Sequence, residues 1–285
     1  MDLEEAAGVL AEEFSRMAPG YESSVARYHA PFVQRVLDAA NPRPGERVLD
    51  IGCGAGDLTL EAARRVGIPG CVVGIDVAEG MIAVAQSRAA AAGVGNAVFR
   101  VMDVRRVAYP EASFDTAVSC LGLPFFDWGS CFRQVHRVLR AGGRFAFVEW
   151  TGKGTPTGRA FFEILERFRS AQRPPGVERI REARRVLRES PMAQAGDPKT
   201  VRPLIEEAGF EVVRCAPETL TRVFPSIDSY IGYMAAFGDV GQELTAMSSD
   251  ARAAFRRELA ARVASSFNVS ELIVSSEVLV CVAGR

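Results

Sequence analysis

A glycine-rich turn between a strand-like and a helix-like segment constrains most strongly how this chain can fold. The stretch VLDIGCGAGD leads from an apolar run directly into Gly52, Gly54 and Gly56. Glycines at this spacing let a backbone turn sharply and approach a ligand that a Cβ atom would keep away. Residues 57–66 then show helical periodicity, with Asp57 placed to cap the helix. A strand, glycine turn and helix in this order predict an α/β sheet that binds a ligand at the turn.

The rest of the chain repeats the same alternation. We expect strands at 47–51, 71–75, 97–101, 114–119 and 144–150, and helices at 57–66, 79–92 and 130–140. Further strand is expected at 210–215 with 219–224, helices around 227–237 and 251–265, and a closing strand at 273–283. Gly93 is expected to end one of these helices, and the stretch AGG at 141–143 another. Strands that alternate with helices favour a doubly wound, mostly parallel sheet of seven strands, in the α/β class.

The chain has the size and composition of one large soluble domain. Its 285 residues are 48% hydrophobic and 24% charged, which excludes disordered and collagen-like classes. We predict a single domain in four parts: an N-terminal helical cap at 1–40, a ligand-binding core at 41–150, a helical lid insertion at 151–198, and further helices with closing strands at 199–285. The insertion is expected to cover one edge of the sheet.

Charge and cysteine usage exclude several classes of partner. The net charge of −1 gives no field that would attract nucleic acid, and no apolar run is long enough to span a membrane. The acidic N-terminus does not resemble a secretory signal, so a cytoplasmic protein is expected. Six scattered cysteines without a C-x-x-C pair, and two histidines in all, predict reduced thiols and no metal site.

Three acidic residues follow three successive predicted strands. Asp50 precedes the first glycine, Asp76 follows the second strand and Asp103 the third. The carboxyl ends of parallel strands share one edge of a sheet, where Asp76 suits the two hydroxyls of a ribose and Asp103 an adenine amino group. Asp50 would repel a pyrophosphate but attract a cationic amine or sulfonium. With Met81 placed to lie against a base, the set predicts an adenosine site without phosphates.

At these residues the chain resembles the class I S-adenosylmethionine-dependent methyltransferases. The segments VLDIGCGAGDLTL, GIDVAEGMIAVA, VMDV and FDTAVSCLGL are similar to that family's first four motifs, and VHRVLRAGG with RFAFVEW to a later one. The resemblance covers residues 21–150 and implies the Rossmann-like methyltransferase fold. It implies S-adenosylmethionine as cofactor and S-adenosylhomocysteine as product. The cofactor contacts that it implies are Tyr21, Asp50, Gly52, Cys53, Gly54, Gly56, Asp76, Val77, Met81, Asp103, Val104, Cys120 and Leu121.

Within that superfamily the chain looks most like the ubiquinone and menaquinone C-methyltransferases. It departs from them after Gly122-Leu123, where Pro124-Phe125 stands in place of the Arg-Asn of the quinone enzymes. This difference argues against a quinone acceptor. The helical segments after residue 150 look more like those of small-molecule methyltransferases in secondary metabolism.

The acceptor site is expected beside the methyl group. Tyr21, Phe125, Trp150 and Phe161 are its predicted lining, while Glu149 and His29 are the candidates for a proton-accepting or orienting group. His136 and Asp127 are interpreted as structural, the latter as a helix cap. The chain is expected to act on a small molecule, as a monomer or homodimer.

The sequence therefore predicts methyl transfer to carbon or oxygen of a small, aromatic or polyketide-like acceptor. Two alternatives stay open. The same fold could bind the cofactor for a non-methylating reaction such as a cyclisation, or serve as a binding module. A nicotinamide-dependent oxidoreductase is disfavoured by Asp50 and by the lack of a Tyr-x-x-x-Lys pair, since lysine occurs only at 153 and 199.

Overall fold

The computed structural model describes residues 1–169, 174–190, 196–268 and 271–285. Its strands form one mixed sheet in the order β3-β2-β1-β4-β5-β8-β6, with the short β7 paired to β8. The strand bounds are β1 Arg47–Ile51, β2 Cys71–Asp76, β3 Ala97–Val101, β4 Phe114–Cys120, β5 Leu139–Trp150, β6 Glu211–Phe224, β7 Phe267–Asn268 and β8 Glu271–Gly284. The predicted seven-stranded α/β sheet is confirmed, with β7 as a short addition.

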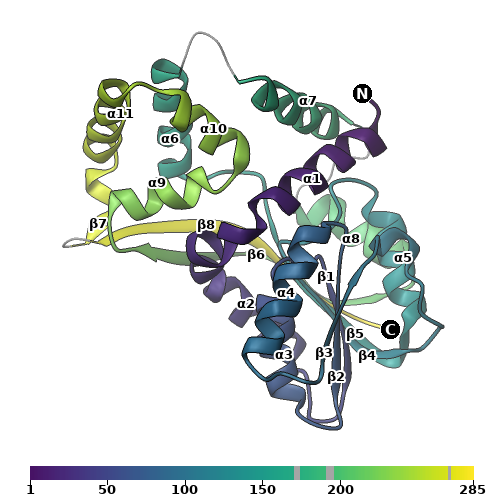
Figure 1. The fold of residues 1–285 in the computed structure, drawn as a ribbon. Helices are drawn as coiled ribbons and strands as arrows, with labels where there is room; N and C mark the ends of the chain where they lie inside the picture. Colours follow the sequence, from purple (N-terminus) through teal and green to yellow (C-terminus); the bar gives the residue numbers. More distant parts are fainter. Residues whose placement is uncertain (170–173, 191–195, 269–270) are drawn as a thin grey trace.

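The first five strands pair in parallel, and β8 and β6 run antiparallel to their neighbours. Helices α2 (Arg27–Ala40), α3 (Asp57–Val66) and α4 (Glu79–Ala91) cover one face, and α5 (Trp128–Val138) and α8 (Pro198–Glu207) cover the other (Figure 1). The strand order reverses between β1 and β4. In doubly wound sheets ligands bind at the carboxyl ends of the strands next to such a reversal.

A second helical layer stands over that edge of the sheet (Figure 1). It is called the cap from here on, and it includes more of the chain than the N-terminal segment predicted at 1–40. It consists of α1 (Leu3–Tyr21), α6 (Pro156–Phe168), α7 (Pro175–Glu189), α9 (Ile227–Ala235), α10 (Gly238–Ala246) and α11 (Ser249–Arg262). A π-helical turn, η1 (Glu22–Ala26), joins α1 to α2, and two 3₁₀ turns, η2 (Val104–Arg106) and η3 (Ala264–Ser266), complete the elements. The long strands β6 and β8 extend from the sheet to the cap, where their ends join a separate aromatic core.

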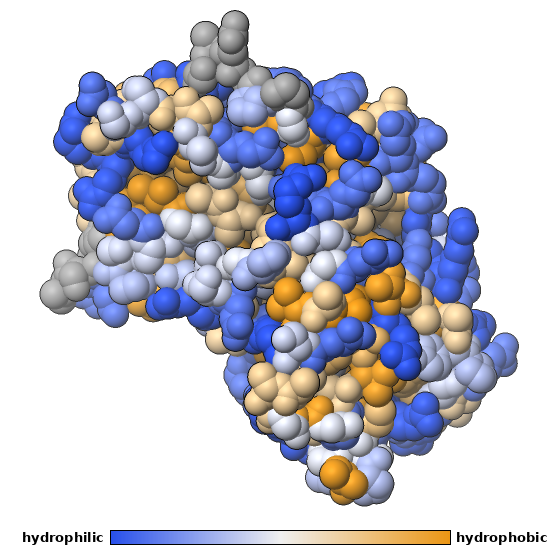
Figure 2. All heavy atoms as spheres, in the orientation of Figure 1, coloured by the Kyte–Doolittle hydropathy of each residue, from blue (hydrophilic) through white to orange (hydrophobic). Residues whose placement is uncertain are grey.

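The cap differs from the expectation in how it packs. Helix α7 lies against α1 and α10, and α6 lies against α11, so residues 151–198 pack mainly on other helices. The segment reaches the edge of the sheet as one part of this cap, and its residues 170–173 and 191–195 fall outside the described residues. Helix α10 was not expected, and β6 is one continuous strand. Figure 2 shows mostly hydrophilic residues on the outer surface of α1 and α7.

Several local predictions can be compared with the structure directly. Asp127 caps α5 by accepting from the Ser130 N–H at 3.1 Å, and Gly93 follows the end of α4 at φ 65°, as predicted. Asp57 does not cap α3: the N-cap is Gly56, and the Asp57 carboxylate pairs with Arg88 at 2.8 Å. Helix α5 ends at Val138, before the stretch AGG, which lies inside β5. Among the described residues, no helix is both long and apolar enough to cross a membrane.

Candidate active site

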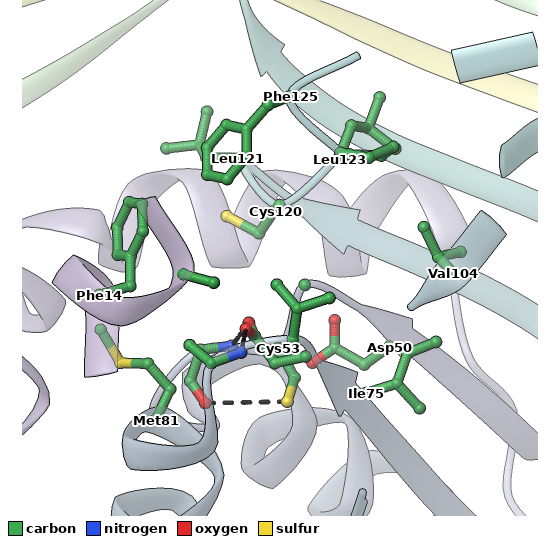
Figure 3. A pocket seen from close by; sticks show the side chains of 18 of the residues that line it. Phe14, Asp50, Cys53, Ile75, Met81, Val104, Cys120, Leu121, Leu123 and Phe125 are labelled. Carbon is green, nitrogen blue, oxygen red and sulfur yellow. Dashed lines mark hydrogen bonds between the residues drawn. The ribbon is translucent and has the colours of Figure 1, made fainter. Parts of the chain in front are cut away.

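A cavity of about 400 Å³ lies between the carboxyl ends of the parallel strands and the cap. Loops after β1, β2, β3 and β4 form its floor, and α1, α2 and α9 contribute to its other walls. In Figure 3, the side chains of Leu121 and Phe125 lie across the cavity from Asp50. The predicted residues that line it are Tyr21, His29, Asp50, Gly52, Cys53, Gly54, Asp76, Val77, Met81, Asp103, Val104, Cys120, Leu121, Phe125 and Trp150.

The glycine turn shapes the floor of the cavity through two different glycines. Gly52 has φ 64°, and a Cβ there would lie 2.1 Å from the Gly122 carbonyl oxygen, so no side chain fits between these loops. Gly54 also has a positive φ, of 51°, but space is open around it on the cavity side. Gly52 therefore lets the β1 and β4 loops touch, while Gly54 leaves room for a ligand.

Asp50 is a buried carboxyl group with an unused acceptor. Its Oδ2 accepts from the Thr59 hydroxyl at 2.6 Å, and its Oδ1 has no hydrogen-bond partner in the protein. Burial raises the pKa of Asp50 to about 8. A buried, unpartnered carboxyl oxygen at a cavity wall is suited to a ligand that brings a cationic donor.

Asp76 is held by the backbone around it. Its Oδ2 accepts from the Gly54 N–H and its Oδ1 from the Ala78 N–H, both at 2.9 Å. Burial raises its pKa in spite of these hydrogen bonds. Each oxygen keeps a free acceptor direction, so the fixed carboxylate can receive two hydroxyl groups of one ligand. Val77 and Met81 continue the same wall.

Asp103 is engaged by an arginine that sequence reasoning did not identify. Arg105 donates to both oxygens of Asp103 and also reaches Glu4 of α1, at 2.9 Å and 3.0 Å. Burial acts to raise the pKa of Asp103, but the hydrogen bonds from Arg105 hold it below the ordinary value. This ion-pair group ties the N-terminal helix to the rim of the cavity.

The wall opposite the glycine turn comes from the loop after β4. Leu121 has φ 56°, a left-handed conformation that costs a non-glycine residue about 1–2 kcal/mol, and its N–H donates to the Val148 carbonyl at 2.8 Å. Cys120 and Leu121 both line the cavity. Tyr21 lines it from the end of α1, and burial, followed by the charge of Asp57, raises the pKa of the Tyr21 hydroxyl.

The other half of the cavity is aromatic. The Phe14 and Phe125 rings are stacked with centroids 6.1 Å apart, and Trp150 lies near His29 with centroids 6.5 Å apart. The His29 Nε2 lies 3.1 Å from the Tyr233 hydroxyl. Burial, together with the positive charge of Arg222, lowers the pKa of His29 to about 3, so this imidazole is neutral at physiological pH.

Three predicted site residues do not line the cavity. Gly56 faces Phe99 and Ala85, where a Cβ would lie 3.0–3.1 Å from their side chains, so its role is in packing. Phe161 is completely buried among the cap helices, with its ring 5.3 Å from that of Phe255. The prediction that it contacts the acceptor is therefore wrong.

Glu149 is the third predicted site residue that does not line the cavity. It is 8% exposed, and its carboxylate accepts from the Trp150 N–H at 2.9 Å and the Leu123 N–H at 3.4 Å. Burial raises its pKa to about 7. Its contacts hold the loop after β4 in place, behind the cavity wall, so a direct role in proton transfer is not supported.

Other cavity residues were missed because nothing in their spacing marks them. Tyr233 and Phe237 come from α9 and the residues after it, about 180 positions from the glycine turn, and Phe126 and Leu123 from the loop after β4. Their sequence context is that of ordinary core residues. Only the tertiary packing of the cap brings them to the cavity.

The residues that line this end of the cavity fit the chemical groups of S-adenosylmethionine. The unpartnered Oδ1 of Asp50 would hold the cationic amino group, the open space at Gly54 leaves room for the methionine chain, and Asp76 would hold the ribose hydroxyls. Met81 and Val104 are apolar surfaces suited to the two faces of the adenine. The arginine at this end, Arg105, is already paired with Asp103 and Glu4.

Comparisons with known proteins identify the family of this chain. A family model described as a methyltransferase domain matches residues 48–143. A nocamycin O-methyltransferase from Saccharothrix syringae is 32% identical over 86% of this chain and 88% of its own length. The aklanonic acid methyltransferase DauC of a Streptomyces strain is 36% identical over 48% of this chain and 63% of its own length.

The chain is also similar to the ubiquinone and menaquinone C-methyltransferases. A ubiquinone/menaquinone biosynthesis C-methyltransferase, UbiE, from Photorhabdus laumondii is 30% identical over 74% of this chain and 86% of its own length. Among solved structures, the YcgJ protein of Bacillus subtilis has the same fold, with a TM-score of 0.53 and 18% identity over 89% of this chain and 97% of that one. The chain belongs to the class I S-adenosylmethionine-dependent methyltransferases.

Proposed function

We propose that this enzyme transfers the methyl group of S-adenosylmethionine to an oxygen atom of a small, polyketide-like acceptor. The observation that carries the proposal is the continuity of the cavity, which joins the acidic cofactor end to an aromatic compartment without a barrier. The choice of oxygen over carbon is supported by the name of the nocamycin O-methyltransferase. The choice of a polyketide-like acceptor is supported by the aromatic and apolar lining of that compartment.

The aromatic compartment favours a flat, mostly apolar molecule. Phe14 and Phe125 are stacked on each other, and Trp150 and Phe237 close the far side. Aromatic walls of this kind bind fused rings through their faces and contribute affinity without fixing many polar contacts. A few polar groups are then needed only to orient the atom that receives the methyl group.

The chain's own contribution to the reaction is mainly positioning. S-adenosylmethionine, when bound, supplies an activated methyl group on a sulfonium leaving group. Asp50 and Asp76 would fix the two ends of this cofactor, and Tyr21, at the end of α1, would close over the reacting atoms. Alignment of two reactants in a dry site can contribute about 7–11 kcal/mol to lowering a barrier.

We also propose that α1 and the helices of residues 151–198 act together as a cover for the cavity. Helix α1 lines it directly, and α7 packs along α1. The π-helical turn η1 lies between α1 and α2, and such turns are frequent at functional sites. Opening at this point would admit ligands without disturbing the sheet.

The test is incubation of the protein with S-adenosylmethionine carrying a labelled methyl group and a panel of hydroxylated anthraquinones and their carboxylic acids. We expect labelled methyl ethers or methyl esters, identified by mass spectrometry and by the carbon chemical shift of the new methyl group. Transfer to carbon, or binding of the cofactor with no transfer to any acceptor, would overturn the proposal. The second result would instead favour a non-methylating role.

A further inference from the structure

Behind the aromatic compartment lies a buried positive charge. Arg222 of β6 is 6% exposed, and among the described residues its guanidinium makes no ion pair with a carboxylate. Its Nη2 donates to the Ser276 hydroxyl at 2.9 Å, and its Nε has no partner. The guanidinium lies 5.4 Å from the ring centroid of Trp150 and 5.1 Å from that of Tyr233. A buried cation without a counter-ion is costly, which calls for an explanation.

A chain of hydrogen bonds connects this cation to the cavity. The Nη1 of Arg222 donates to the Tyr233 hydroxyl oxygen at 2.7 Å, and that hydroxyl lies 3.1 Å from the His29 Nε2. Tyr233 and His29 line the cavity, whereas Arg222 stands behind them. The cation therefore acts on the cavity through two neutral side chains.

Hydrogen counting shows what this pair can offer. If the His29 Nε2 carries the proton, it donates to Tyr233 and leaves the tyrosine hydroxyl hydrogen unused. If Nε2 is the acceptor, the tyrosine donates to it, and the hydrogen on Nδ1 of His29 is unused. In either tautomer, therefore, one hydrogen of the Tyr233 and His29 pair is not used in the hydrogen bond between these two side chains. Because Arg222 already donates to Tyr233, that remaining donor is polarised toward an acceptor of negative charge.

The two ends of the cavity thus differ in sign. Asp50, Asp76 and Asp103 lie at the cofactor end, and the Arg222, Tyr233 and His29 group lies at the other. A positively charged methyl donor and a negatively charged acceptor would each meet the complementary charge. The arrangement would also orient the two reactants toward each other.

We infer that the acceptor is bound as an oxygen anion, such as a carboxylate, an enolate or a phenolate, by the Tyr233 and His29 pair backed by Arg222. This inference rests on the proposed oxygen transfer. In the step, a lone pair of the anionic oxygen forms the bond to the methyl carbon, and the carbon–sulfur bond breaks with its electrons passing to sulfur. The oxygen becomes neutral, the sulfonium becomes a thioether, and no proton moves.

An anionic acceptor also accounts for the absence, among the described residues at the acceptor end of the cavity, of a strong base. Glu149 is outside it, and His29 is too weak a base to remove a proton from a neutral hydroxyl group. An acceptor that ionises in solution needs no such base. Tyr233 and His29 are then binding residues, and Arg222 is a positioning residue that acts through them.

The experiment compares two ligands of the same shape on protein loaded with S-adenosylhomocysteine. Calorimetry measures the binding of naphthalene-2-carboxylate and of naphthalene-2-carboxamide near neutral pH. We expect the acid to bind about tenfold more tightly than the amide. We expect Arg222→Met and Tyr233→Phe to remove this preference, Arg222→Lys to retain part of it, and Tyr230→Phe, which alters a neighbouring buried ring outside the cavity, to leave it unchanged.

A second measurement uses the fact that the chain has only two histidines. The NMR signals of the His29 imidazole should shift when the acid is added and stay in place with the amide, while His136 on α5 serves as an internal reference. In Arg222→Met the pKa of His29 should rise. If that variant does not fold, Tyr233→Phe with the same titration decides the question.

Equal or tighter binding of the amide, survival of the preference in Arg222→Met or Tyr233→Phe, or no binding of the acid up to its solubility would overturn the inference. None of these measurements involves methyl transfer. An acid preference that depends on Arg222, in a protein that methylates no oxygen acceptor, would reject the proposed function and keep the anion site. Methylation of neutral hydroxyl groups without any acid preference would do the reverse.

Discussion

The two ends of the cavity are built in different ways. At the cofactor end, Asp50, Gly54 and Asp76 lie within 27 consecutive residues, and the Gly54 and Ala78 N–H groups hold Asp76 through hydrogen bonds of 2.9 Å. At the acceptor end, Arg222 and Tyr233 lie 11 residues apart in β6 and α9, whereas His29 of α2 is 204 residues from Tyr233. The contacts that form the first end are local in the chain. The second depends on how the cap is docked, so it can vary between relatives without disturbing cofactor binding.

This difference predicts that changes in the turn act on cofactor affinity, whereas changes in the cap act on acceptor choice. The following variants test the cofactor end and its support, and are ordered by their expected effect on S-adenosylhomocysteine binding or turnover.

The largest effect is expected from Gly52→Ala. Its Cβ would meet the Gly122 backbone at 2.1–2.6 Å, so the loops after β1 and β4 would have to separate. We expect at least a hundredfold loss of S-adenosylhomocysteine affinity, about 3 kcal/mol, by calorimetry. Gly45→Ala is the matched control, since Gly45 also has a positive φ, of 85°, but no atom lies within 4 Å of its Cβ. Equal losses in the two variants would show that strain alone, and not loop contact, matters.

Asp76→Ala comes next. It removes the proposed ribose contacts and also the acceptor for the Gly54 and Ala78 N–H groups. We expect at least a tenfold loss of affinity, about 1.4 kcal/mol. Asp38→Ala, an exposed carboxylate on α2, should leave binding unchanged. Wild-type affinity in Asp76→Ala on calorimetric titration would contradict the ribose assignment.

Asp50→Asn tests whether ionisation of Asp50 makes S-adenosylhomocysteine affinity depend on pH. The pKa of Asp50 is raised to about 8, so below that pH the carboxyl group is mostly protonated in the free protein. Pairing with a cationic amino group favours the ionised form, so binding releases a proton, and the affinity of the wild type should rise with pH up to about 8. Calorimetry in buffers of different ionisation enthalpy measures the released proton. Asn cannot ionise, so an unchanged proton release in the variant would rule out Asp50 as its source.

Glu149→Gln should have the smallest effect on turnover, because Gln can still accept from the Trp150 N–H. Its effect should appear in stability instead. The folded-state pKa of about 7 lies above the ordinary 4.5, so ionisation of Glu149 destabilises the fold as pH rises between these values, by at most about 3 kcal/mol. Denaturant unfolding at acidic and at alkaline pH should show a smaller loss of stability in the variant. A turnover more than about tenfold below wild type would restore Glu149 as a participant in the reaction.

Much of the core followed from short-range patterns. Strands at 47–51 and 97–101 begin and end where the sequence predicts, since an apolar run bounded by turn residues is typical of a parallel strand. Most of the residues predicted to contact the cofactor line the cavity, because the segments that carry them follow strands whose carboxyl ends meet at one edge. Gly56 and Asp57 were misassigned within that same turn, because spacing alone cannot show which side of a turn faces the ligand.

The acceptor end could not be read in this way. Phe161 and Trp150 are both aromatic residues in apolar surroundings, yet one is sealed inside the cap and the other lines the cavity. Arg222 stands in a strand among alternating residues and looks like a surface arginine in the sequence. Its burial results from the folding of the cap over β6 and β8.

The sequence by itself therefore determined the sheet, the glycine turn and the acids that follow the strands, because these depend on residues close together in the chain. The tertiary structure alone decided which aromatic side chains face the cavity, that Glu149 supports a loop, and that a buried arginine stands behind Tyr233 and His29. Those features depend on contacts between segments up to about 200 residues apart, and no local pattern encodes such contacts.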